Sequence, residues 1–274
     1  MSLSERFNEA KEKYNDYSPK NEVWTITFGE CVENHTGMQT IGEKSNKGFS
    51  ADEVKSAYEV ATANGFNCEL IYLNEALPED EKAEDAYILI VRNGISMFFD
   101  DEEKDVKEFN KEVYATKDIV DKKAFMKGRV VNKKARYNLC YAEASQLPDY
   151  ENKKGTIVSF KDTPCLQKIR EKLPELLGEK AKELMAELNY YYDVKKCYIG
   201  YHGDTERSRV IGIRVGSNFS LKYNWYKKCK PIGKEIKFML SNGDFYVMSD
   251  KAVGMDWKRR VVCTLRHAAG MDKD

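Results

Sequence analysis

The chain has 274 residues, of which 42% are hydrophobic and 12% aromatic, so it can build a substantial core in one large domain or two smaller ones. Lysine plus arginine and aspartate plus glutamate number 45 each, so no net charge draws the whole molecule to nucleic acid or to an anionic surface. No apolar run reaches the roughly 20 residues that a membrane span needs, and the polar start of the chain is unlike a signal peptide. We therefore expect no membrane partner.

The seven cysteines are well separated and form no Cys-x-x-Cys pair. An odd number of dispersed cysteines argues against a disulfide framework and against a structural zinc site. We expect reduced thiols that pack in the interior, and a cytoplasmic, intracellular location where the surroundings are reducing.

The first part of the chain, residues 1–112, predicts a small α/β module of unknown role. A capping box at Ser50 and Glu53 begins a helix that ends at Asn64-Gly65. Alternating or β-branched runs predict strands, and Asn93-Gly94 is a turn signal for a hairpin. An acidic run should form a solvated loop. The expected strands cover 23–28, 68–73, 86–91 and 95–99, and the acidic loop covers 100–105.

A basic stretch follows. Between residues 122 and 136 the chain has seven lysines and arginines and no acid, with Tyr137 and other aromatic residues close by. Cations for phosphates and aromatic faces for bases are what a nucleic-acid groove requires. Segment 117–141 is therefore a candidate nucleic-acid contact, in which Arg129, Arg136 and Tyr137 would grip a strand. A basic surface that only offsets the preceding acids is the alternative.

The C-terminal part, residues 113–274, predicts helices and then many strands. Thr163-Pro164 should begin a helix that Pro174 breaks, and a second helix is expected from Glu175 to Leu188. The rest reads as short strands, which are typical of a closed barrel or jelly roll. These strands are expected at 189–193, 197–204, 209–215, 219–226, 235–240, 244–249 and 260–267.

One of these strands contains His202-Gly203-Asp204. Side chains alternate along a strand, so His202 and Asp204 should point the same way. With one more imidazole they would form the two-His-one-carboxylate facial triad, which leaves positions on Fe(II) open for a co-substrate and dioxygen.

An ordered series of motifs surrounds this pair. The motifs are Asn189-Tyr190-Tyr191, Gly200-Tyr201-His202-Gly203-Asp204-Thr205-Glu206, Val210-Ile211-Gly212-Ile213-Arg214-Val215-Gly216, Gly243-Asp244-Phe245-Tyr246-Val247-Met248 and Arg260-Val261-Val262-Cys263-Thr264-Leu265-Arg266. In order and spacing the series resembles the AlkB-like branch of the Fe(II)/2-oxoglutarate-dependent dioxygenases, whereas the N-terminal half lies outside the resemblance. The resemblance implies a double-stranded β-helix (a jelly-roll relative), so the expected fold class is α+β with this domain after the α/β module.

The resemblance also implies residue roles. Asn189 and Tyr191 would contact 2-oxoglutarate, and Arg260 and Arg266 have the spacing of the family's two arginines. A guanidinium fork suits a carboxylate of that co-substrate.

The third metal ligand departs from the family pattern, because Lys258 stands where a histidine is expected. In one alternative His267 closes the triad, and Arg214, Lys222 or Arg260 holds the 2-oxoglutarate carboxylate. In the other, the arginines keep their family roles and the metal site is incomplete, since His35 is the only other imidazole.

The leading hypothesis is an Fe(II)- and 2-oxoglutarate-dependent dioxygenase with His202, Asp204 and His267 as metal ligands. Near Tyr201 it would hydroxylate or oxidatively demethylate a substrate, foremost an alkylated nucleic-acid base that leaves its stack to enter the pocket. The alternative is a metal-free, dioxygenase-like barrel that acts as a nucleic-acid or protein binding module.

Overall fold

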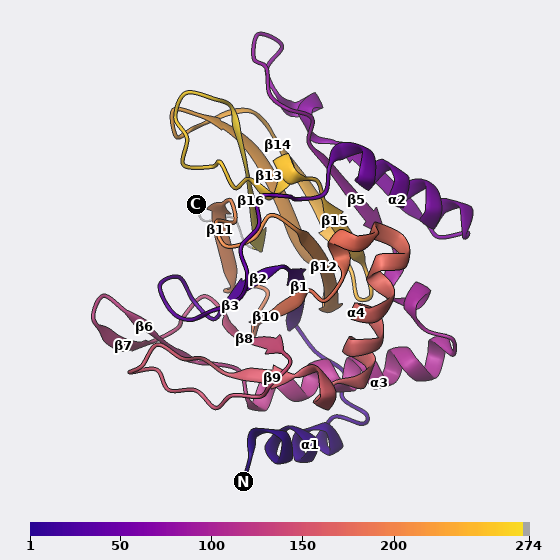
Figure 1. Ribbon diagram of the computed structural model, residues 1–274, viewed down its shortest axis with the longest axis vertical. Helices are drawn as coiled ribbons and strands as arrows, with labels where there is room; N and C mark the ends of the chain where they lie inside the picture. The colour runs from indigo at the N-terminus through magenta and orange to yellow at the C-terminus, as the bar shows by residue number, and fades with distance from the viewer. Residues whose placement is uncertain (271–274) are drawn as a thin grey trace.

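The computed structural model describes residues 1–270, which form two β-sheets and a layer of helices (Figure 1). The larger sheet has eight strands in the order β4-β5-β15-β12-β1-β10-β8-β9, and the smaller has four in the order β11-β16-β13-β14. Two short hairpins, β2-β3 and β6-β7, complete the β-structure of these residues. The expected α+β class is confirmed at this level.

Along the chain, the helices are separated by strands that mostly follow one another in groups. The helices are α1 (Leu3–Lys13), α2 (Ala51–Ala63), α3 (Glu102–Ala115), α4 (Pro164–Leu177) and α5 (Asp250–Val253). The strands are β1 (Val23–Gly29), β2 (Cys31–Glu33), β3 (Thr40–Gly42), β4 (Cys68–Tyr72), β5 (Tyr87–Val91), β6 (Lys123–Met126), β7 (Arg129–Asn132), β8 (Tyr137–Ala142), β9 (Ile157–Ser159), β10 (Met185–Tyr191), β11 (Tyr198–His202), β12 (Val210–Gly216), β13 (Phe219–Lys227), β14 (Lys230–Leu240), β15 (Phe245–Met248) and β16 (Thr264–Gly270).

The alternation of β1 shows how the larger sheet divides its two faces. Trp24, Ile26 and Phe28 are fully buried in one core with apolar residues of α1, α2, α3 and α4. Thr25 and Thr27, on the opposite face, line a cavity. Because side chains alternate along a strand, one face of this sheet holds the helices and the other is available for a site.

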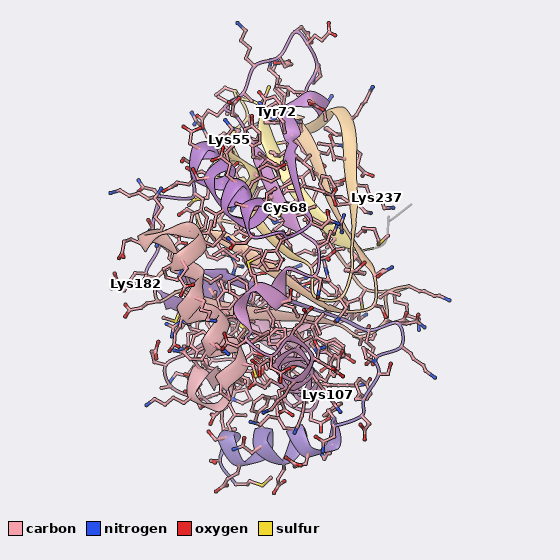
Figure 2. The ribbon with its side chains drawn as sticks, turned by 90° about the vertical axis from the view of Figure 1, so that its right-hand side faces the viewer. Lys55, Cys68, Tyr72, Lys107, Lys182 and Lys237 are labelled. Atoms are coloured by element: carbon pink, nitrogen blue, oxygen red, sulfur yellow. The ribbon has the colours of Figure 1, made fainter. Side chains whose placement is uncertain are left out.

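The helix layer extends to the edge of the larger sheet. The capping box predicted at Ser50 and Glu53 is confirmed, and α2 packs on β4 and β5. Figure 2 shows α2, which carries Lys55, beside the strand that carries Cys68 and Tyr72. None of the helices in the described part of the chain has the length and apolar character that crossing a membrane requires.

A second core joins the two sheets. Trp225 and Leu265 of the smaller sheet are fully buried with Ile90 and Met248 of the larger one. This apolar packing closes one end of the space between the sheets. The other end is lined by polar residues and forms the cavity described below.

The predicted boundary at residue 112 does not follow the sheet. β1 is hydrogen-bonded along one edge to β10 and along the other to β12, and β5 pairs with β15. Residues 1–112 therefore supply strands to a sheet whose remaining strands come from residues 113–270. One continuous sheet therefore crosses the boundary that was predicted between residues 1–112 and 113–274.

The helix predicted from Glu175 to Leu188 is wrong. Pro174 lies inside α4, which continues to Leu177 and ends at Gly178 with a φ of 69°. Residues 185–191 instead form β10, which has hydrogen-bonded neighbours on both edges, β1 and β8. Those two ladders outweigh the helical periodicity that the apolar residues suggest.

Two local predictions in the N-terminal part are also wrong. Gly94–Phe98 is a 3-10 helix rather than a strand, and Gly94 lies so close to Phe245 that an added Cβ would be 2.7 Å from that residue's Cβ. The acidic run is the start of α3 rather than a loop, because Asp101 caps the helix by accepting from the Lys104 amide. Acids in a first turn also complement the helix dipole.

Candidate metal centre

Two strands of the smaller sheet bring the two histidines together. β11 and β16 pair antiparallel with His202 opposite His267, and their ring centroids are 4.5 Å apart. The register shifts between Ile199 and His202, which marks an irregularity of the bulge type. Bulges re-aim side chains at the end of a ladder, and here both imidazoles reach the cavity between the sheets.

Asp204 lies just beyond β11 and completes the group. Its Oδ1 is 3.6 Å from Nε2 of His202 and 3.6 Å from Nε2 of His267, and the three donor atoms lie within 4.8 Å of one another. Bonds of about 2 Å to one ion place neighbouring ligand atoms roughly 3 Å apart, so small side-chain shifts would enclose an ion. The donor set therefore fits a transition metal.

Gly203 allows this turn of the chain. A Cβ on Gly203 would lie 1.9 Å from the Gly254 carbonyl oxygen, which is backbone and cannot rotate away. The Asp204 amide donates to the Val253 carbonyl in the same region. The absence of a side chain between the two ligand residues is thus required by packing against the loop that follows α5.

His202 is prepared to act as a ligand. Its Nδ1–H donates to the Gly200 carbonyl at 2.8 Å, which leaves the lone pair on Nε2 directed toward Asp204. Burial, and then the nearby His267, lower the pKa of His202 to about 4. The imidazole is therefore neutral at pH 7, the form that binds a metal.

Asp204 is held ionised. Burial works against its charged form, but the Arg207 guanidinium and the two imidazoles outweigh burial and keep its pKa below the usual value. Arg207 Nε donates to Oδ2 of Asp204 at 3.1 Å, on the side away from the histidines. The carboxylate consequently presents Oδ1 to the imidazoles.

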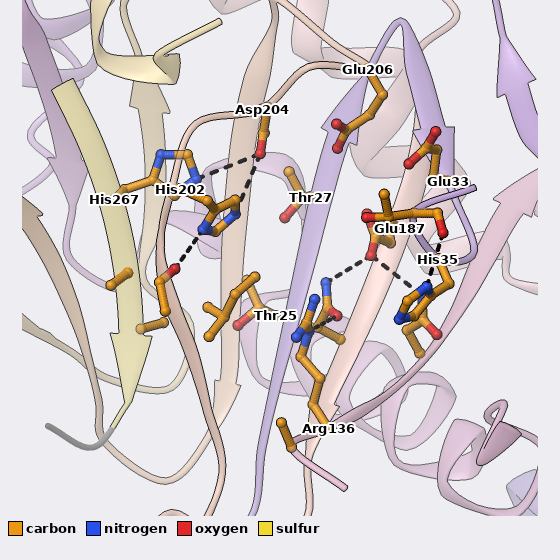
Figure 3. A pocket seen from close by; sticks show the side chains of 18 of the residues that line it. Thr25, Thr27, Glu33, His35, Arg136, Glu187, His202, Asp204, Glu206 and His267 are labelled. Atoms are coloured by element: carbon orange, nitrogen blue, oxygen red, sulfur yellow. Dashed lines mark hydrogen bonds and ion pairs between the residues drawn. The ribbon is translucent and has the colours of Figure 1, made fainter. Parts of the chain in front are cut away.

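These groups form one end of a polar cavity of about 880 Å³ between the two sheets. Figure 3 shows the metal-ligand candidates at one end and a wall of charged residues from β2, β10 and the β7–β8 connection at the other. The labelled residues run from His267, His202 and Asp204 through Thr25 and Thr27 to Glu206, Glu33, Glu187, His35 and Arg136. His35 lies on the far wall and is not part of the histidine–aspartate group.

Arg214 is a buried cation in this cavity. It is 1% exposed, its Nη1 donates to Thr25 Oγ1 at 2.7 Å, and its Nε has no hydrogen-bond partner. Within residues 1–270 no carboxylate forms an ion pair with it. A buried guanidinium without a counterion is costly, so the position suits an anionic ligand.

The residues predicted to hold 2-oxoglutarate divide into two groups. Asn189 and Tyr191 line the cavity from β10, as the alternation of that strand requires. Arg260 is exposed and lies outside the lining, and Arg266 places its guanidinium 4.0 Å from the ring of Tyr226. The structure therefore does not bring this arginine pair to the cavity. Since His267 faces inward, its strand neighbour Arg266 faces away.

The three basic residues proposed as alternatives for holding the 2-oxoglutarate carboxylate also differ in whether they line the cavity. Arg214 lines the cavity, whereas Lys222 lies on β13 outside the lining. Lys258 lines the rim, with its Nζ 5.3 Å from the ring of Trp257. His267, rather than a residue near position 258, accompanies the His-x-Asp pair.

The predicted substrate contacts are likewise split. Arg136 and Tyr201 line the cavity, but Arg129 is exposed on β7 and Tyr137 stacks on Tyr192 at 4.9 Å. Asn138, which follows Tyr137 on β8, faces the cavity instead. The basic segment forms the β6-β7 hairpin and its return to β8, and it supplies one rim of the cavity.

Two cavity residues were missed in the sequence. Glu187 precedes Asn189 by two residues on β10 and shares its face, but the helix predicted there hid this periodicity. Arg207 follows Asp204 by three residues, and only the turn after β11 brings it back to that carboxylate. A spacing of three would pair the two residues on a helix, but this part of the chain is predicted as a strand and its turn, and alternation along a strand does not predict the contact.

Comparison with known proteins relates the chain to a viral protein. No family model matches the chain. It is 46% identical, over 254 aligned residues, to "Uncharacterized protein R156" of Acanthamoeba polyphaga mimivirus. The aligned region covers 92% of this chain and 97% of the relative. The chain therefore belongs to the same family as this viral protein.

Proposed function

We propose that the protein is an Fe(II)- and 2-oxoglutarate-dependent dioxygenase whose two facing sheets form a double-stranded β-helix of the jelly-roll type. The observation that carries the proposal is a pair of sites in one cavity: the His202–Asp204–His267 donor set and the unpaired guanidinium of Arg214. A facial triad leaves metal positions open for a bidentate co-substrate, and a buried arginine suits its remote carboxylate.

The side chains around Arg214 support this use of the cavity. Tyr191 and Tyr246 are buried beside it, and the ring of Tyr246 lies over Gly212, where a Cβ would be 1.9 Å from the ring. The phenols and Thr25 can donate hydrogen bonds to a carboxylate. Arg136 donates to Asn189 Oδ1 at 2.7 Å, which fixes the amide that would touch the co-substrate.

Each residue would have a defined task in the reaction. His202, Asp204 and His267 would hold the ion, and Arg214 would orient 2-oxoglutarate and exclude water from its carboxylate. When bound, Fe(II) with 2-oxoglutarate and dioxygen supplies oxidation of a substrate C–H bond, with release of succinate and carbon dioxide. The substrate would enter at the rim between Tyr201 and the β6-β7 hairpin.

An alkylated nucleic-acid base is the substrate that this rim favours. The hairpin presents Lys123, Lys127 and Arg129 to solvent, and a second exposed basic run, residues 258–260, follows the rim residue Trp257. Cations near an aromatic side chain suit single-stranded nucleic acid. Hydroxylation of an N-methyl group would give a hemiaminal, which releases formaldehyde and the free base.

The test is a turnover assay. Purified protein with Fe(II), ascorbate and 2-oxoglutarate is expected to form succinate, with more succinate when methylated single-stranded oligonucleotides are added. His202→Ala should abolish turnover, and Arg214→Met should raise the KM for 2-oxoglutarate by about 10- to 100-fold, the loss of one charged hydrogen-bonding group. Succinate at the level of the His202→Ala control, with every substrate class tried, would contradict the proposal.

A further inference from the structure

Arg207 is a buried cation enclosed by three carboxylates. Its Nε donates to Asp204, and its Nη2 donates to Glu187 at 2.7 Å and to Glu206 at 2.6 Å. Arg207 is 5% exposed, and Asp204 and Glu187 are also buried. Three carboxylates around one guanidinium leave an excess of negative charge, which a divalent cation would compensate.

Stability alone does not account for this cluster. Removing several charges from water costs free energy that their mutual attraction only partly returns. Arg207 Nη1 also has no hydrogen-bond partner. The cluster does, however, fix one geometrical feature: with Oδ2 of Asp204 bonded to Arg207, Oδ1 remains for the imidazoles.

Glu187 anchors Arg207 to the rigid part of the fold. It lies on β10, a strand with neighbours on both edges. Oε2 of Glu187 accepts from Arg207, while its Oε1 accepts from Asn189 at 3.0 Å and from Asn138 at 3.4 Å. A carboxylate bonded in this way cannot rotate without losing several partners. It therefore holds Arg207 at a fixed position relative to the sheet.

We propose that Arg207 is a positioning residue that turns Asp204 so that Oδ1 alone faces the metal, and that Glu187 holds Arg207 in place for this task. The inference rests on the proposed metal centre and adds residues that surround the ligands. Groups that orient metal ligands commonly change metal affinity by 10- to 100-fold when they are mutated.

Electrostatics and positioning predict opposite results, which makes the inference testable. Arg207 is a cation beside a site for a cation, so by charge alone its removal should strengthen metal binding. If Arg207 positions Asp204, its removal should weaken metal binding although a repulsive charge is gone. Arg207→Lys keeps the charge but lacks the planar fork that reaches several carboxylates at once.

The experiment measures Mn(II) affinity of the full chain by electron paramagnetic resonance of free Mn(II). We expect wild type to bind most tightly, Arg207→Lys more weakly, and Arg207→Gln and Glu187→Gln about 10- to 100-fold more weakly than wild type. Arg209→Gln is the matched control, since Arg209 is bonded to the Lys47 carbonyl rather than to the cluster, and it should stay within twofold. The absorption of bound Co(II) should change in the cluster variants only.

The outcomes separate the two proposals. Near-ultraviolet circular dichroism identifies the folded variants. If Arg207→Gln does not fold, Arg207→Lys decides the result, because it keeps the charge and only a loss of positioning would then weaken Mn(II) binding. Folded cluster variants that bind Mn(II) as tightly as wild type, or more tightly, would overturn the positioning role while leaving the metal centre intact. A wild-type protein that binds no Mn(II) would instead overturn the proposed function, and the positioning role with it.

Discussion

Gly200 and Gly203 are on either side of the ligand His202, and their surroundings differ sharply. A Cβ on Gly203 would overlap the Gly254 carbonyl oxygen at 1.9 Å, whereas a Cβ on Gly200 meets nothing within 4 Å. We predict that Gly203→Ala destabilises the protein by about 1–3 kcal/mol, the usual cost of overpacking, and displaces Asp204 enough to weaken metal binding.

Gly200→Ala is the matched control for that change. The backbone carbonyl of residue 200, which accepts a hydrogen bond from His202, is retained in this variant. Urea unfolding and Mn(II) titration of both variants check the prediction. Equal stability and equal affinity for Gly203→Ala and wild type would show that the close approach to Gly254 does not constrain the site.

Arg214 allows a prediction in which stability and binding change in opposite directions. Replacing an unpaired buried charge with an apolar side chain of similar length is often neutral or stabilising. We therefore expect Arg214→Met to match or exceed wild type in its free energy of unfolding without ligand, yet to lose the stabilisation that 2-oxoglutarate with Mn(II) gives wild type. Thermal unfolding with and without these ligands measures both effects, and an unchanged ligand shift would remove Arg214 from co-substrate binding.

The candidate site was partly predictable from single residues. His202, Asp204 and His267 follow from the chemistry of a facial triad, because the chain offers only three histidines. Arg260 and Arg266 were assigned by resemblance, and strand alternation argues against the second of them once His267 points inward. Arg214 was one of three basic residues that the sequence left open, and its place in the cavity lining distinguishes it from Lys222 and Arg260. The contact of Arg207 with Asp204 depends on the turn after β11, which strand alternation does not predict.

At the scale of elements, the region after α4 shows why hydrophobic periodicity predicted a helix where the structure has a strand. Its apolar residues suit a helix up to Leu188, and Pro174 was expected to separate two helices. In the structure the helix includes the proline, Gly178 ends it, and β10 begins at Met185. Pairing with strands distant in sequence decided the conformation, and local propensity carries no information about such partners.

The junction between α3 and α4 predicts a pH dependence. Glu112 is buried, and its carboxylate accepts from the backbone amides of Cys165 and Leu166 at 3.0 and 3.2 Å. Burial, opposed by these bonds, raises the pKa of Glu112 from 4.5 to about 7. Between these values the folded state binds more protons than the unfolded state, so the free energy of unfolding falls as pH rises through this window.

The expected size of this effect is up to about 3 kcal/mol, from 1.36 kcal/mol per pKa unit. Glu112→Gln imitates the protonated group and should lack this component of the pH dependence. Urea unfolding of both proteins at pH 5 and pH 8 provides the comparison. If the difference between wild type and variant were the same at both pH values, Glu112 would not be the titrating group.

For the whole molecule, β1 predicts that the chain folds as a unit. It fills the gap between β10 and β12, so removing residues 1–112 would expose two strand edges and the apolar faces of Trp24's neighbours. We expect the fragment 113–274 to lack a cooperative unfolding transition, while the full chain shows one. A fragment with dispersed amide resonances and a cooperative thermal transition would contradict this expectation and would support two separate domains.

The sequence could not reveal this arrangement, although it predicted the strand at 23–28. Order in a sheet depends on long-range pairing, and a central strand that is first in sequence resembles the start of an independent module. The α+β class and most C-terminal strands were predictable, because alternation and glycine-rich turns are local signals.

The most direct test of the metal centre is equilibrium Mn(II) binding to wild type, His267→Ala and His35→Ala. We expect one bound ion in wild type, its loss in His267→Ala, and unchanged binding in His35→Ala, because His35 is on the opposite wall of the cavity. Absence of binding in wild type, or equal binding in wild type and His267→Ala, would contradict it.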